Sequence, residues 1–367
     1  MTAKPGILFI KKYDTNAKFI TNDIELLQER YNVKLNSVKT NSIFYLIISL
    51  ILQFFFLIYN ILNTKVIYIW FADHHSILPV FIAKIFNRKS VICAGGYECT
   101  YIPEINCGVF TKGSISKRIR HFCVEYSLKN CSLILPVDES LINNVNTYIY
   151  SDVENKPPLE DGIKTLIPGI TTPIKAINLG YDSRIFNSDP SIKKENSVLS
   201  AGLIVNEDEY NRKGFDLLVE AASQMPDIKF ILVGLNNEFT GKLKKLNISN
   251  LELYGIISFS KLIEAYQRSK IFAQISMFEG MPSTLCEAML CECIPVGSNV
   301  NGIPGIISDT GYIVYKKDIN NIINTLRNAL HSTDELGKKA KERIMTNYSI
   351  QNRKIRLNKE IENIISQ

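Results

Sequence analysis

The sequence lacks the features that mark several large classes of protein. Its eight cysteines are scattered without a C-x-x-C pair, so we expect neither a disulfide framework nor a structural zinc site. The N-terminal segment MTAKPGILFIKKYD is too polar for a secretory signal, which favours a cytoplasmic protein with reduced thiols. The chain has no internal repeat and no low-complexity tract. What remains is an ordinary globular composition, 46% hydrophobic and 21% charged.

Negative charge is scarce in the first third of the chain. Through residue 135 there are 16 Lys and Arg against 8 Asp and Glu, whereas the net charge of all 367 residues is +6. The basic excess includes KGSISKRIRHF, residues 112–122. One interpretation of this basic segment is simply a solvated helix face. The more specific interpretation is a binding surface for an anionic partner, either a membrane surface or a phosphate-bearing substrate. We do not expect nucleic acid as a partner, because no aromatic–basic interleaving or known binding module is present.

One long hydrophobic run, IFYLIISLILQFFFLIYNIL, occupies residues 43–62 without a charged residue and is long enough to cross a bilayer. However, residues 6–10 and 65–71 on either side of it have the pattern of buried parallel strands. A membrane span would place these two strands on opposite sides of the bilayer. We therefore favour a helix that stays on one side, either packed in the core or partly sunk in the membrane surface beside the basic segment, with a span as the alternative.

Short apolar strands alternate with helical periodicity along the chain, which predicts an α/β protein with parallel sheets. The polar segment NSDPSIKKENS, residues 187–197, is the expected linker, so we predict an N-terminal domain over 1–187 and a C-terminal domain over 188–340. The expected strands are 6–10, 65–71, 90–94, 132–136, 174–178, 197–202, 228–233, 251–254, 271–275, 293–297 and 311–314. Ligands of such sheets bind at the carboxyl ends of the strands, and two such domains facing each other make a cleft.

The segment MFEGMPSTLCEAML, residues 277–290, follows one of these strands and opens a helix near Ser283. The first amides of a helix form a phosphate site, Gly280 permits close backbone approach, and Pro282 fixes the helix entry. Glu279 and Glu287 could then bind sugar hydroxyls at the two ends of the phosphate. The alternatives are that Thr284 and Glu287 form a T-x-x-E capping box and that Glu279 is a solvated loop charge.

The longer segment EGMPSTLCEAMLCECIPVGSNVNGIPGII resembles the donor-site signature of family 4 retaining glycosyltransferases, with Gly305 in place of a usual glutamate. Residues 126–145, 176–186 and 198–234 are similar to other parts of that family in the same order, so the resemblance covers most of residues 65–350. It implies the GT-B fold, in which two Rossmann-like domains face each other across a cleft. It also implies a C-terminal helix, about 334–366, whose last part, 341–367, crosses back to the N-terminal domain.

The resemblance implies a role for each residue of the signature. Glu279 holds the donor sugar, Glu287 holds the nucleotide ribose, and Lys213 neutralises the diphosphate, so Glu279 and Lys213 are the expected catalytic residues. No metal and no cofactor are expected besides a UDP- or GDP-linked donor. The family arginine is replaced by Leu203, for which Arg212 is the nearest substitute, and the usual Gly-Gly pair is missing from residues 11–23. The main chain expected to meet sugar and phosphate is Gly280, Met281, Pro282, Ser283, Thr284 and Leu285.

Two other loops that follow strands are candidates for acceptor binding. Gly95 and Gly96 allow a tight loop in CAGGYECTYIPEINCG, where Glu98 could accept hydrogen bonds from a sugar. Asp73 and His74 in WFADHHS could orient an acceptor hydroxyl. For Glu98 and His74 the alternative is that each caps a helix or satisfies a buried amide.

The expected function is transfer of a sugar from a nucleotide sugar to a glycan or lipid-linked saccharide, with retention, in synthesis of cell-surface polysaccharide or glycoconjugate. In this family the departing phosphate is thought to accept the acceptor's proton, so no protein nucleophile is expected. We expect a cytoplasmic protein, peripheral at the inner face of the membrane and in contact with anionic lipid. The alternatives are a nucleotide-sugar epimerase or a phosphorylase of the same fold, and a catalytically silent sugar-binding subunit.

Overall fold

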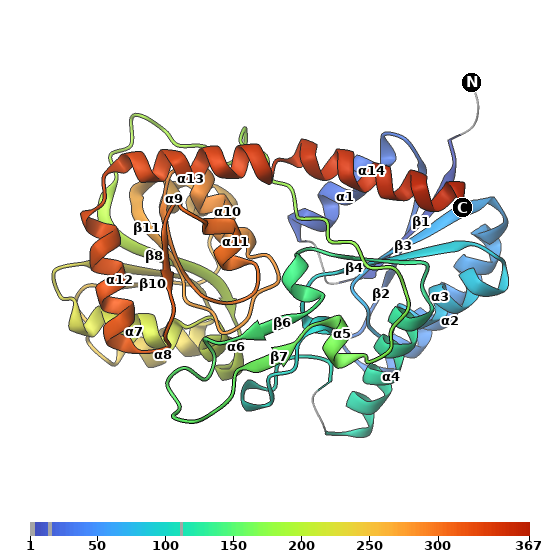
Figure 1. Cartoon of the computed structure of the whole chain (residues 1–367), viewed down its shortest axis with the longest axis horizontal. Helices are drawn as coiled ribbons and strands as arrows, with labels where there is room; N and C mark the ends of the chain where they lie inside the picture. The colour runs from blue at the N-terminus through green and yellow to red at the C-terminus, as the bar shows by residue number, and fades with distance from the viewer. Residues whose placement is uncertain (1–3, 14–16, 111–112) are drawn as a thin grey trace. The chain divides into compact units, whose positions relative to one another are not determined.

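The computed structural model describes residues 4–13, 17–110 and 113–367, so Lys112 of the basic segment lies outside the described residues (Figure 1). The chain forms two units with separate cores. Unit 1 comprises the chain up to Asn144, Asp161–Gly180 and Gln351–Gln367. Unit 2 comprises Val145–Glu160 and Tyr181–Ile350. Residues 145–160, which fall inside the predicted N-terminal range, are therefore part of unit 2.

Unit 1 is built on a five-stranded parallel sheet of order β2-β1-β3-β4-β5. The side chains of Ile67, Tyr68, Ile69 and Trp70 in β3 are fully buried, as a parallel sheet covered on both faces requires. Helices α1 and α14 lie on one face, and α2, α3 and α4 lie on the other (Figure 1). The elements are β1 Gly6–Lys12, α1 Lys18–Gln28, β2 Asn32–Val38, α2 Ile43–Asn60, β3 Thr64–Trp70, α3 Ile77–Ile85, β4 Lys89–Ala94, α4 Ile115–Asn130, β5 Leu133–Pro136 and α14 Ile350–Ser366.

The apolar run forms α2, which connects β2 to β3. Both strands pair with β1, so the strands flanking the run share one sheet, as expected for a helix on one side of a membrane. Within α2 only Gln53, Leu57 and Asn60 are buried, which is the opposite of a core helix. Among the described residues, Ile43–Asn63 is also the one helical segment long and apolar enough to cross a membrane by length and composition.

A buried ion pair joins α14 to α1 within unit 1. The guanidinium of Arg353 donates from Nε and Nη2 to the two carboxylate oxygens of Asp23 in α1, each at 2.7 Å. Tyr68 and Trp70 also donate to Asp23 Oδ2, each at 2.8 Å. Arg353 Nη1 donates to the carbonyl of Ile177 at 2.8 Å. Because the carboxylate and the guanidinium are both compensated, this pair can remain buried in the core.

Unit 2 is built on a six-stranded parallel sheet of order β10-β9-β8-β11-β12-β13. Helices α9, α10 and α13 pack together, and α12 packs against α7. The elements are β8 Glu195–Ile204, α6 Glu207–Arg212, α7 Phe215–Gln224, β9 Lys229–Leu235, α8 Asn237–Lys244, β10 Leu251–Tyr254, α9 Phe259–Arg268, β11 Ser269–Gln274, α10 Ser283–Leu290, β12 Ile294–Ser298, α11 Ile303–Ile307, β13 Tyr312–Val314, α12 Ile319–His331 and α13 Asp334–Asn347.

Two expectations about secondary structure were wrong. The expected helix over 334–366 is two helices, because the backbone of Tyr181 pairs with the chain between α13 and α14: its N–H donates to Tyr348 and its carbonyl accepts from Ile350. The expected strand 174–178 makes only one bridge, between Ile134 and Ile174. Residue 173 is a proline and cannot donate to β5, which limits a regular ladder at this position.

The remaining elements are short. Strands β6 Asn144–Asn146 and β7 Leu159–Asp161 pair with each other, and α5 covers Ile163–Leu166. Within the described ranges, 3₁₀ turns lie at η1 Ile61–Asn63, η2 Tyr97–Cys99, η3 Pro103–Ile105 and η4 Glu139–Leu141. All eight cysteines are free and buried, which confirms the prediction of reduced interior thiols.

Candidate functional site

The loop between β11 and α10 lies at the carboxyl edge of the unit 2 sheet. Strand β11 ends at Gln274, and α10 begins at Ser283 with Pro282 as its N-cap residue. Proline fits this position because its φ of −72° suits the entry to a helix. The loop after β8, which includes α6, reaches the same edge and ends at Lys213 and Gly214. The two loops carry the candidate donor-binding residues.

Glu279 is the centre of this site and is 8% exposed. Its Oε1 atom accepts hydrogen bonds from Lys213 Nζ at 2.5 Å, Ser276 Oγ at 3.1 Å and Gln274 Nε2 at 3.2 Å. Burial raises the pKa of Glu279, but the charges of Lys213 and Arg212 outweigh this effect, and the net pKa lies below the ordinary value. Glu279 is therefore an ionised, buried carboxylate, and its interpretation as a solvated loop charge was wrong.

Two cations come from neighbouring positions at the end of α6. Arg212 Nη1 lies 3.7 Å from Glu279 Oε1 and donates to the carbonyl of Phe278 at 3.1 Å. Leu203, which stands where the resemblance expects an arginine, is 58% exposed on β8. Arg212 thus brings a guanidinium to the Glu279 carboxylate although Leu203 supplies none.

A tight turn presents Lys213 to this site. Gly214 has φ +69°, and a Cβ atom at this position would lie 2.0 Å from the carbonyl oxygen of Ile275. Only glycine permits this approach between the two loops without strain. In addition, the N–H of Met277 donates to the carbonyl of Arg212 at 2.8 Å, which joins the loops directly.

Glu287 lies in the second turn of α10 and accepts a hydrogen bond from the hydroxyl of Tyr266 at 3.1 Å. Burial raises its pKa to about 8. The capping-box interpretation was wrong, because no side chain within the described residues caps α10 and the N-cap residue is Pro282. Thr284 donates instead to Gln274 Oε1 at 3.2 Å, and Ser283 Oγ lies 3.4 Å from the hydroxyl of Tyr181.

The remaining signature residues contribute backbone more than side chains. Met281 is 6% exposed, and the side chain of Leu285 is fully buried. Gly280 and Pro282 are also buried. That the main chain opening α10 meets a ligand stays a prediction from the sequence.

Sequence reasoning missed several residues that brace the loop. Gln274 is 1% exposed and bonds to Ser276 and Glu279, while Ser298 Oγ donates to the carbonyl of Ser276 at 2.6 Å. Asn146 Nδ2 donates to the carbonyl of Met277 at 2.9 Å. A glutamine at the end of the apolar strand IFAQIS was a usable signal, because a buried amide needs partners.

In unit 1, the candidate acceptor residues gather at the carboxyl edge of the five-stranded sheet. Asp73, after β3, is 2% exposed and accepts from Arg120 Nε at 3.0 Å and Nη2 at 2.7 Å. It is also ion-paired with Lys12 at the end of β1, and its Oδ1 accepts from the N–H of His74 at 2.7 Å. Burial raises the pKa of Asp73, but Lys12 and Arg120 hold it well below the ordinary value.

Glu98 holds the two loops of unit 1 together. Its carboxylate accepts from the backbone N–H of Ala72 at 3.3 Å, of Gly95 at 3.2 Å and of Gly96 at 3.2 Å. It is 1% exposed, so it satisfies buried amides, which is the alternative expected for this residue. A Cβ atom on Gly95 would lie 2.2 Å from the ring of Phe71, and Gly96 has φ +138°. Both glycines are therefore required by the loop's shape.

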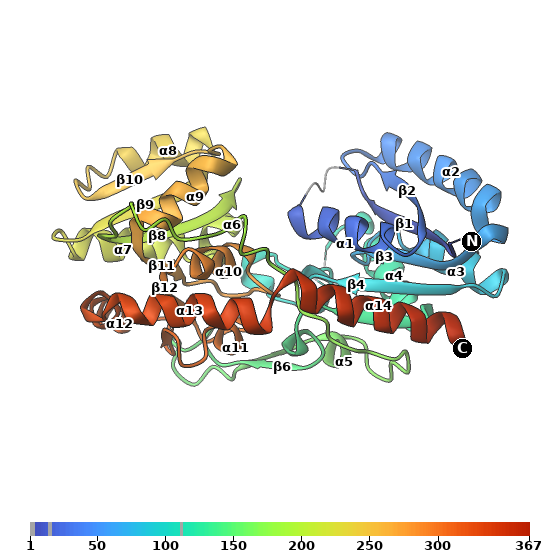
Figure 2. The ribbon, with the colours of Figure 1, turned by 90° about the horizontal axis from the view of Figure 1, so that it is seen from above.

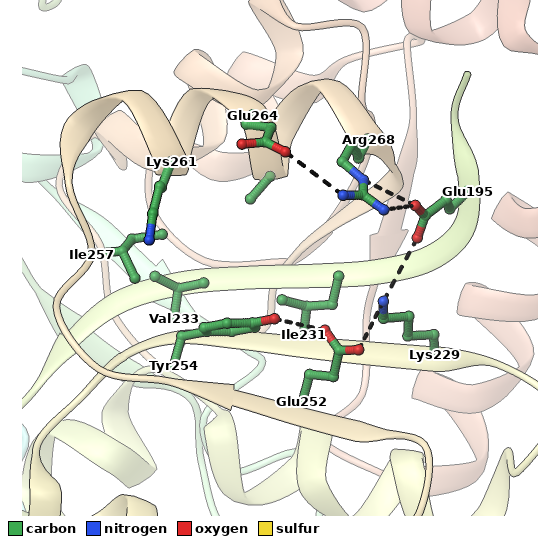
Figure 3. A pocket seen from close by; sticks show the side chains of 11 residues that line it. Glu195, Lys229, Ile231, Val233, Glu252, Tyr254, Ile257, Lys261, Glu264 and Arg268 are labelled. Atoms are coloured by element: carbon green, nitrogen blue, oxygen red, sulfur yellow. Dashed lines mark hydrogen bonds and ion pairs between the residues drawn. The ribbon is translucent and has the colours of Figure 1, made fainter. Parts of the chain in front are cut away.

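A cavity of about 320 Å³ lies elsewhere in unit 2, between α9 and strands β9 and β10 (Figure 3). None of the predicted site residues lines it. Several of its charged side chains pair with one another: Arg268 Nε donates to Glu195 at 2.9 Å, and Lys229 lies 2.8 Å from Glu252. Lys261 also lines the cavity, and we assign the cavity no function.

Comparison with known proteins relates the C-terminal half of the chain to glycosyltransferases. Residues 184–347 match the family model described as "Glycosyl transferases group 1". The chain is 33% identical over 156 residues to the trehalose synthase of Thermococcus litoralis. This aligned region covers 37% of this chain and 36% of that protein. The chain thus spans about a third of the length of this relative. The matched family region contains both loops of the unit 2 site.

The fold as a whole is similar to that of solved glycosyltransferases. Sucrose-phosphate synthase from Thermosynechococcus elongatus has a TM-score of 0.72 and 13% identity, with 99% of this chain and 100% of that chain covered. HepE from Anabaena, in complex with UDP, has a TM-score of 0.69 and 12% identity, with 98% and 100% covered. The chain has the GT-B fold of these proteins, with two Rossmann-like domains.

Proposed function

We propose that this protein is a family 4 retaining glycosyltransferase. It transfers a sugar from a UDP- or GDP-linked donor to a glycan or lipid-linked saccharide in cell-surface polysaccharide or glycoconjugate synthesis. The observation that carries the proposal is the cluster of Glu279, Lys213 and Arg212 beside the N-terminus of α10. The HepE structures, which hold UDP or UDP-glucose on a similar fold, support a nucleotide-sugar donor.

The donor diphosphate binds where positive charge and main-chain amides converge. Lys213 and Arg212 balance the charge that develops on the nucleoside diphosphate as the glycosidic bond breaks, so no metal is needed. The amides that open α10 bind phosphate oxygens. Glu279 is paired with Lys213, whose Nζ lies 2.5 Å from Glu279 Oε1. When the diphosphate takes over this role, the carboxylate is available to accept hydrogen bonds from hydroxyls of the donor sugar.

Glu287 binds the ribose of the donor. Its carboxyl group accepts a hydrogen bond from the hydroxyl of Tyr266 at 3.1 Å, and burial raises its pKa to about 8. Ribose hydroxyls that donate to this carboxylate favour its ionised form. Nucleotide binding and deprotonation of Glu287 are therefore coupled.

The chemical step uses no protein nucleophile. The departing phosphate accepts the proton of the acceptor hydroxyl, and the new bond forms on the face of the sugar that the phosphate leaves. The side chains at the expected diphosphate position are the cations Lys213 and Arg212 and the carboxylate of Glu279. This carboxylate already accepts three hydrogen bonds. Their part is to hold the donor and stabilise the leaving group.

Release of nucleoside diphosphate, measured with and without an acceptor extract, tests the proposal. We expect acceptor-dependent release that falls by about tenfold or more in Lys213→Met, because a charge-assisted hydrogen bond is lost. Lys245→Met, an exposed lysine on the same unit, is the control. An isomerised nucleotide sugar formed without acceptor would indicate an epimerase, and binding without turnover of any donor would indicate a silent subunit.

We also propose that unit 1 binds the cytoplasmic face of an anionic membrane through the outer side of α2 and the adjoining parts of α3 and α4 (Figure 2). Gln53 holds the other side of α2 in the unit by donating to Asn36 Oδ1 and to the carbonyl of His75, each at 3.2 Å. The large apolar side chains exposed on the three helices are Ile43, Phe44, Tyr45, Ile47, Ile48, Ile51, Leu52, Phe54, Phe55, Ile58, Tyr59, Phe81, Ile85, Ile115, Ile119 and Phe122.

The exposed apolar side chains lie on helices in mutual contact, and the same helices carry exposed positive charges. Both observations favour a bilayer surface as the partner of this apolar face. Helices α2 and α3 are in contact, as are α3 and α4, so the exposed side chains belong to neighbouring helices. Lys84, Arg118 and Lys129 are exposed on the same helices and suit anionic headgroups. A single apolar patch of this extent is otherwise unusual on a soluble monomer.

Sedimentation with vesicles tests the membrane proposal. We expect binding to phosphatidylglycerol-containing vesicles, weaker binding to pure phosphatidylcholine, and release of the protein from native membranes by a carbonate wash. Phe55→Glu should reduce vesicle binding, whereas Tyr254→Glu, on an exposed strand of unit 2, should not. Equal binding of Phe55→Glu and the parent would contradict the proposal, and resistance to carbonate would indicate a span.

A further inference from the structure

The loop after β12 lies against the loop between β11 and α10, which we call the donor loop. Strand β12 ends at Ser298 and pairs in parallel with β11, so both loops leave the same edge of the unit 2 sheet. The Oγ atom of Ser298 donates to the carbonyl of Ser276 in the donor loop at 2.6 Å. Further along, the buried side chains of Val300 and Ile303 anchor the loop after β12 in the unit. Its position beside the donor loop is therefore fixed.

Asn301 is the residue of this second loop that contacts Glu279. Its Oδ1 atom accepts a hydrogen bond from the backbone N–H of Glu279 at 3.4 Å. The backbone of Asn301 has φ 40°, in the left-handed region that asparagine enters more readily than most residues. Because a backbone N–H can only donate, this bond directs the amide oxygen of Asn301 toward Glu279 and its NH₂ group to the opposite side.

The amide group of Asn301 is only half satisfied. Its Nδ2 atom is buried, yet no atom of residues 4–13, 17–110 and 113–367 accepts a hydrogen bond from it. The amide of Gln274, at the same site, is fully engaged: Nε2 donates to Ser276 and Glu279, and Oε1 accepts from Thr284. A buried donor without an acceptor destabilises the folded chain. Its presence beside the donor site indicates a ligand that accepts from it.

The carboxylate of Glu279 offers a complementary group. Its hydrogen bonds from Lys213, Gln274 and Ser276 all end on Oε1, and none within the described part of the chain ends on Oε2. Oε2 can accept a hydrogen bond, whereas Nδ2 of Asn301 can donate one. Sugar hydroxyls both donate and accept, so they match the two groups together. Phosphate oxygens only accept and carry negative charge, which the carboxylate repels.

We infer that Asn301 is a specificity-determining residue that donates from Nδ2 to a hydroxyl of the transferred sugar. The inference rests on the proposed glycosyltransferase function, because it names a further contact to the donor within the same site. The cations Lys213 and Arg212 are assigned to the diphosphate, and Glu287 is assigned to the ribose. Loss of the Asn301 amide should therefore weaken binding of the nucleotide sugar and leave binding of the bare nucleotide unchanged.

Calorimetric titration of the full chain tests this contact without an acceptor. The probes are UDP-glucose, UDP-galactose, UDP-N-acetylglucosamine and GDP-mannose, and the one that the parent binds most tightly is compared with its own nucleoside diphosphate. The quantity measured is the Kd of the nucleotide sugar divided by the Kd of the nucleotide. Asn301→Gly should raise this ratio by about three- to tenfold, because one neutral hydrogen bond is lost. Glycine adopts a φ of 40° freely, so the substitution removes the amide without backbone strain.

A matched control and a second variant separate sugar contact from support of the loop. Asn247 also lies in unit 2 with a positive φ, 51°, and is exposed, so Asn247→Gly should change neither Kd. Asn301→Asp keeps an oxygen that accepts from the Glu279 N–H but replaces the NH₂ group by a second acceptor. It should therefore raise the ratio at least as much as Asn301→Gly, whereas a residue that only supports the loop would leave the ratio at the parent value.

The outcomes distinguish failure of the inference from failure of the proposed function. A parent that binds none of these nucleotides would contradict the proposed function and the inference with it. A parent that binds a nucleotide but no nucleotide sugar would overturn the inference. An unchanged ratio in Asn301→Gly, or in Asn301→Asp where the glycine variant does not fold, would also overturn the inference while nucleotide binding still supports the proposed function.

Discussion

The pair formed by Lys213 and Glu279 makes a quantitative prediction about stability. Lys213→Met keeps the apolar stem of the side chain but leaves Glu279 without the cation at 2.5 Å. Removing one partner of a buried ion pair costs about 3–5 kcal/mol. The two side chains are 15% and 10% exposed, and Arg212 remains 3.7 Å away, so we expect the lower end, about 3 kcal/mol. For a unit of this size that corresponds to a decrease in Tm of roughly 6–12 °C.

A double-mutant cycle with Glu279→Gln isolates the pairwise interaction. Each single variant leaves one charged partner behind, whereas the double variant leaves neither. We therefore expect the double variant to lose about 1–3 kcal/mol less stability than the sum of the two single variants. Because the pKa of Glu279 is lowered on folding, this stabilisation is present above the ordinary carboxyl pKa and is lost as acidification protonates the group.

Thermal unfolding of the parent, the two single variants and the double variant at pH 7 provides the assay, with Lys245→Met as the surface control. The same samples with UDP at a hundred times its dissociation constant should show a stabilisation of about 2.7 kcal/mol in the parent and less in Lys213→Met at the same UDP concentration. Additive costs within about 0.5 kcal/mol would show that the two residues are not coupled and would refute the reasoning.

Four further predictions concern other residues of the molecule. Burial raises the pKa of Glu287 from its ordinary value of 4.5 to about 8 in the folded protein, so the free energy of unfolding should fall as the pH rises from 4.5 to 8. Denaturant titrations at pH 5 and pH 8 measure this decline, and Glu287→Gln should remove it. UDP binding at pH 7 should release protons in calorimetry with buffers of different ionisation enthalpy, and the same variant should abolish the release. Gly169→Ala should lower the free energy of unfolding by about 1 kcal/mol, because this glycine has a positive φ. Gly214→Ala should lower it more, because Gly214 also has a positive φ and its added Cβ atom would meet a carbonyl oxygen. Equal losses in Tm would contradict this. Asp23→Asn should lower the free energy of unfolding by about 3 kcal/mol or more in urea, because it breaks the buried pair with Arg353. Glu362→Gln in an exposed pair should change it by about 0.5 kcal/mol or less; a similar effect of both would contradict a stabilising role for the buried pair.

The donor loop could be predicted from sequence because its information is local. A strand, a glycine, a proline and two glutamates within fourteen residues define a helix entry and its neighbours. The partners of Glu279 were less accessible. Lys213 is 66 positions away, and only the resemblance connected it with Glu279. Gln274 and Ser276 are hidden in an apolar strand and its exit, where sequence pattern indicates burial but not which polar atoms meet.

The unit 1 site shows the limit of local pattern more clearly. Asp73 and Glu98 were both identified as candidate acceptor residues from their place after strands, yet Glu98 proves to bind backbone amides. Lys12 and Arg120 were not identified, because the sheet order brings β1 beside β3 and α4 onto the same edge. Strand β2 was missed as well, since NVKLNSV is an edge strand with polar side chains and little hydrophobic signal.

The salt link between Asp23 and Arg353 constrains the order of events during synthesis. Asp23 and Arg353 are 330 positions apart, so the ribosome translates Arg353 long after Asp23. Unit 1 is completed only by Gln351–Gln367. Until they emerge, the nascent chain carries a carboxylate whose site lacks its counterion, flanked by the hydroxyl of Tyr68 and the indole of Trp70. Unit 2 is entirely translated before that moment. Translation of unit 1 therefore begins before that of unit 2 and ends after it. A truncated chain that ends before Arg353 should expose α1 to proteolysis, whereas Glu279 and its neighbours in unit 2 should already be folded.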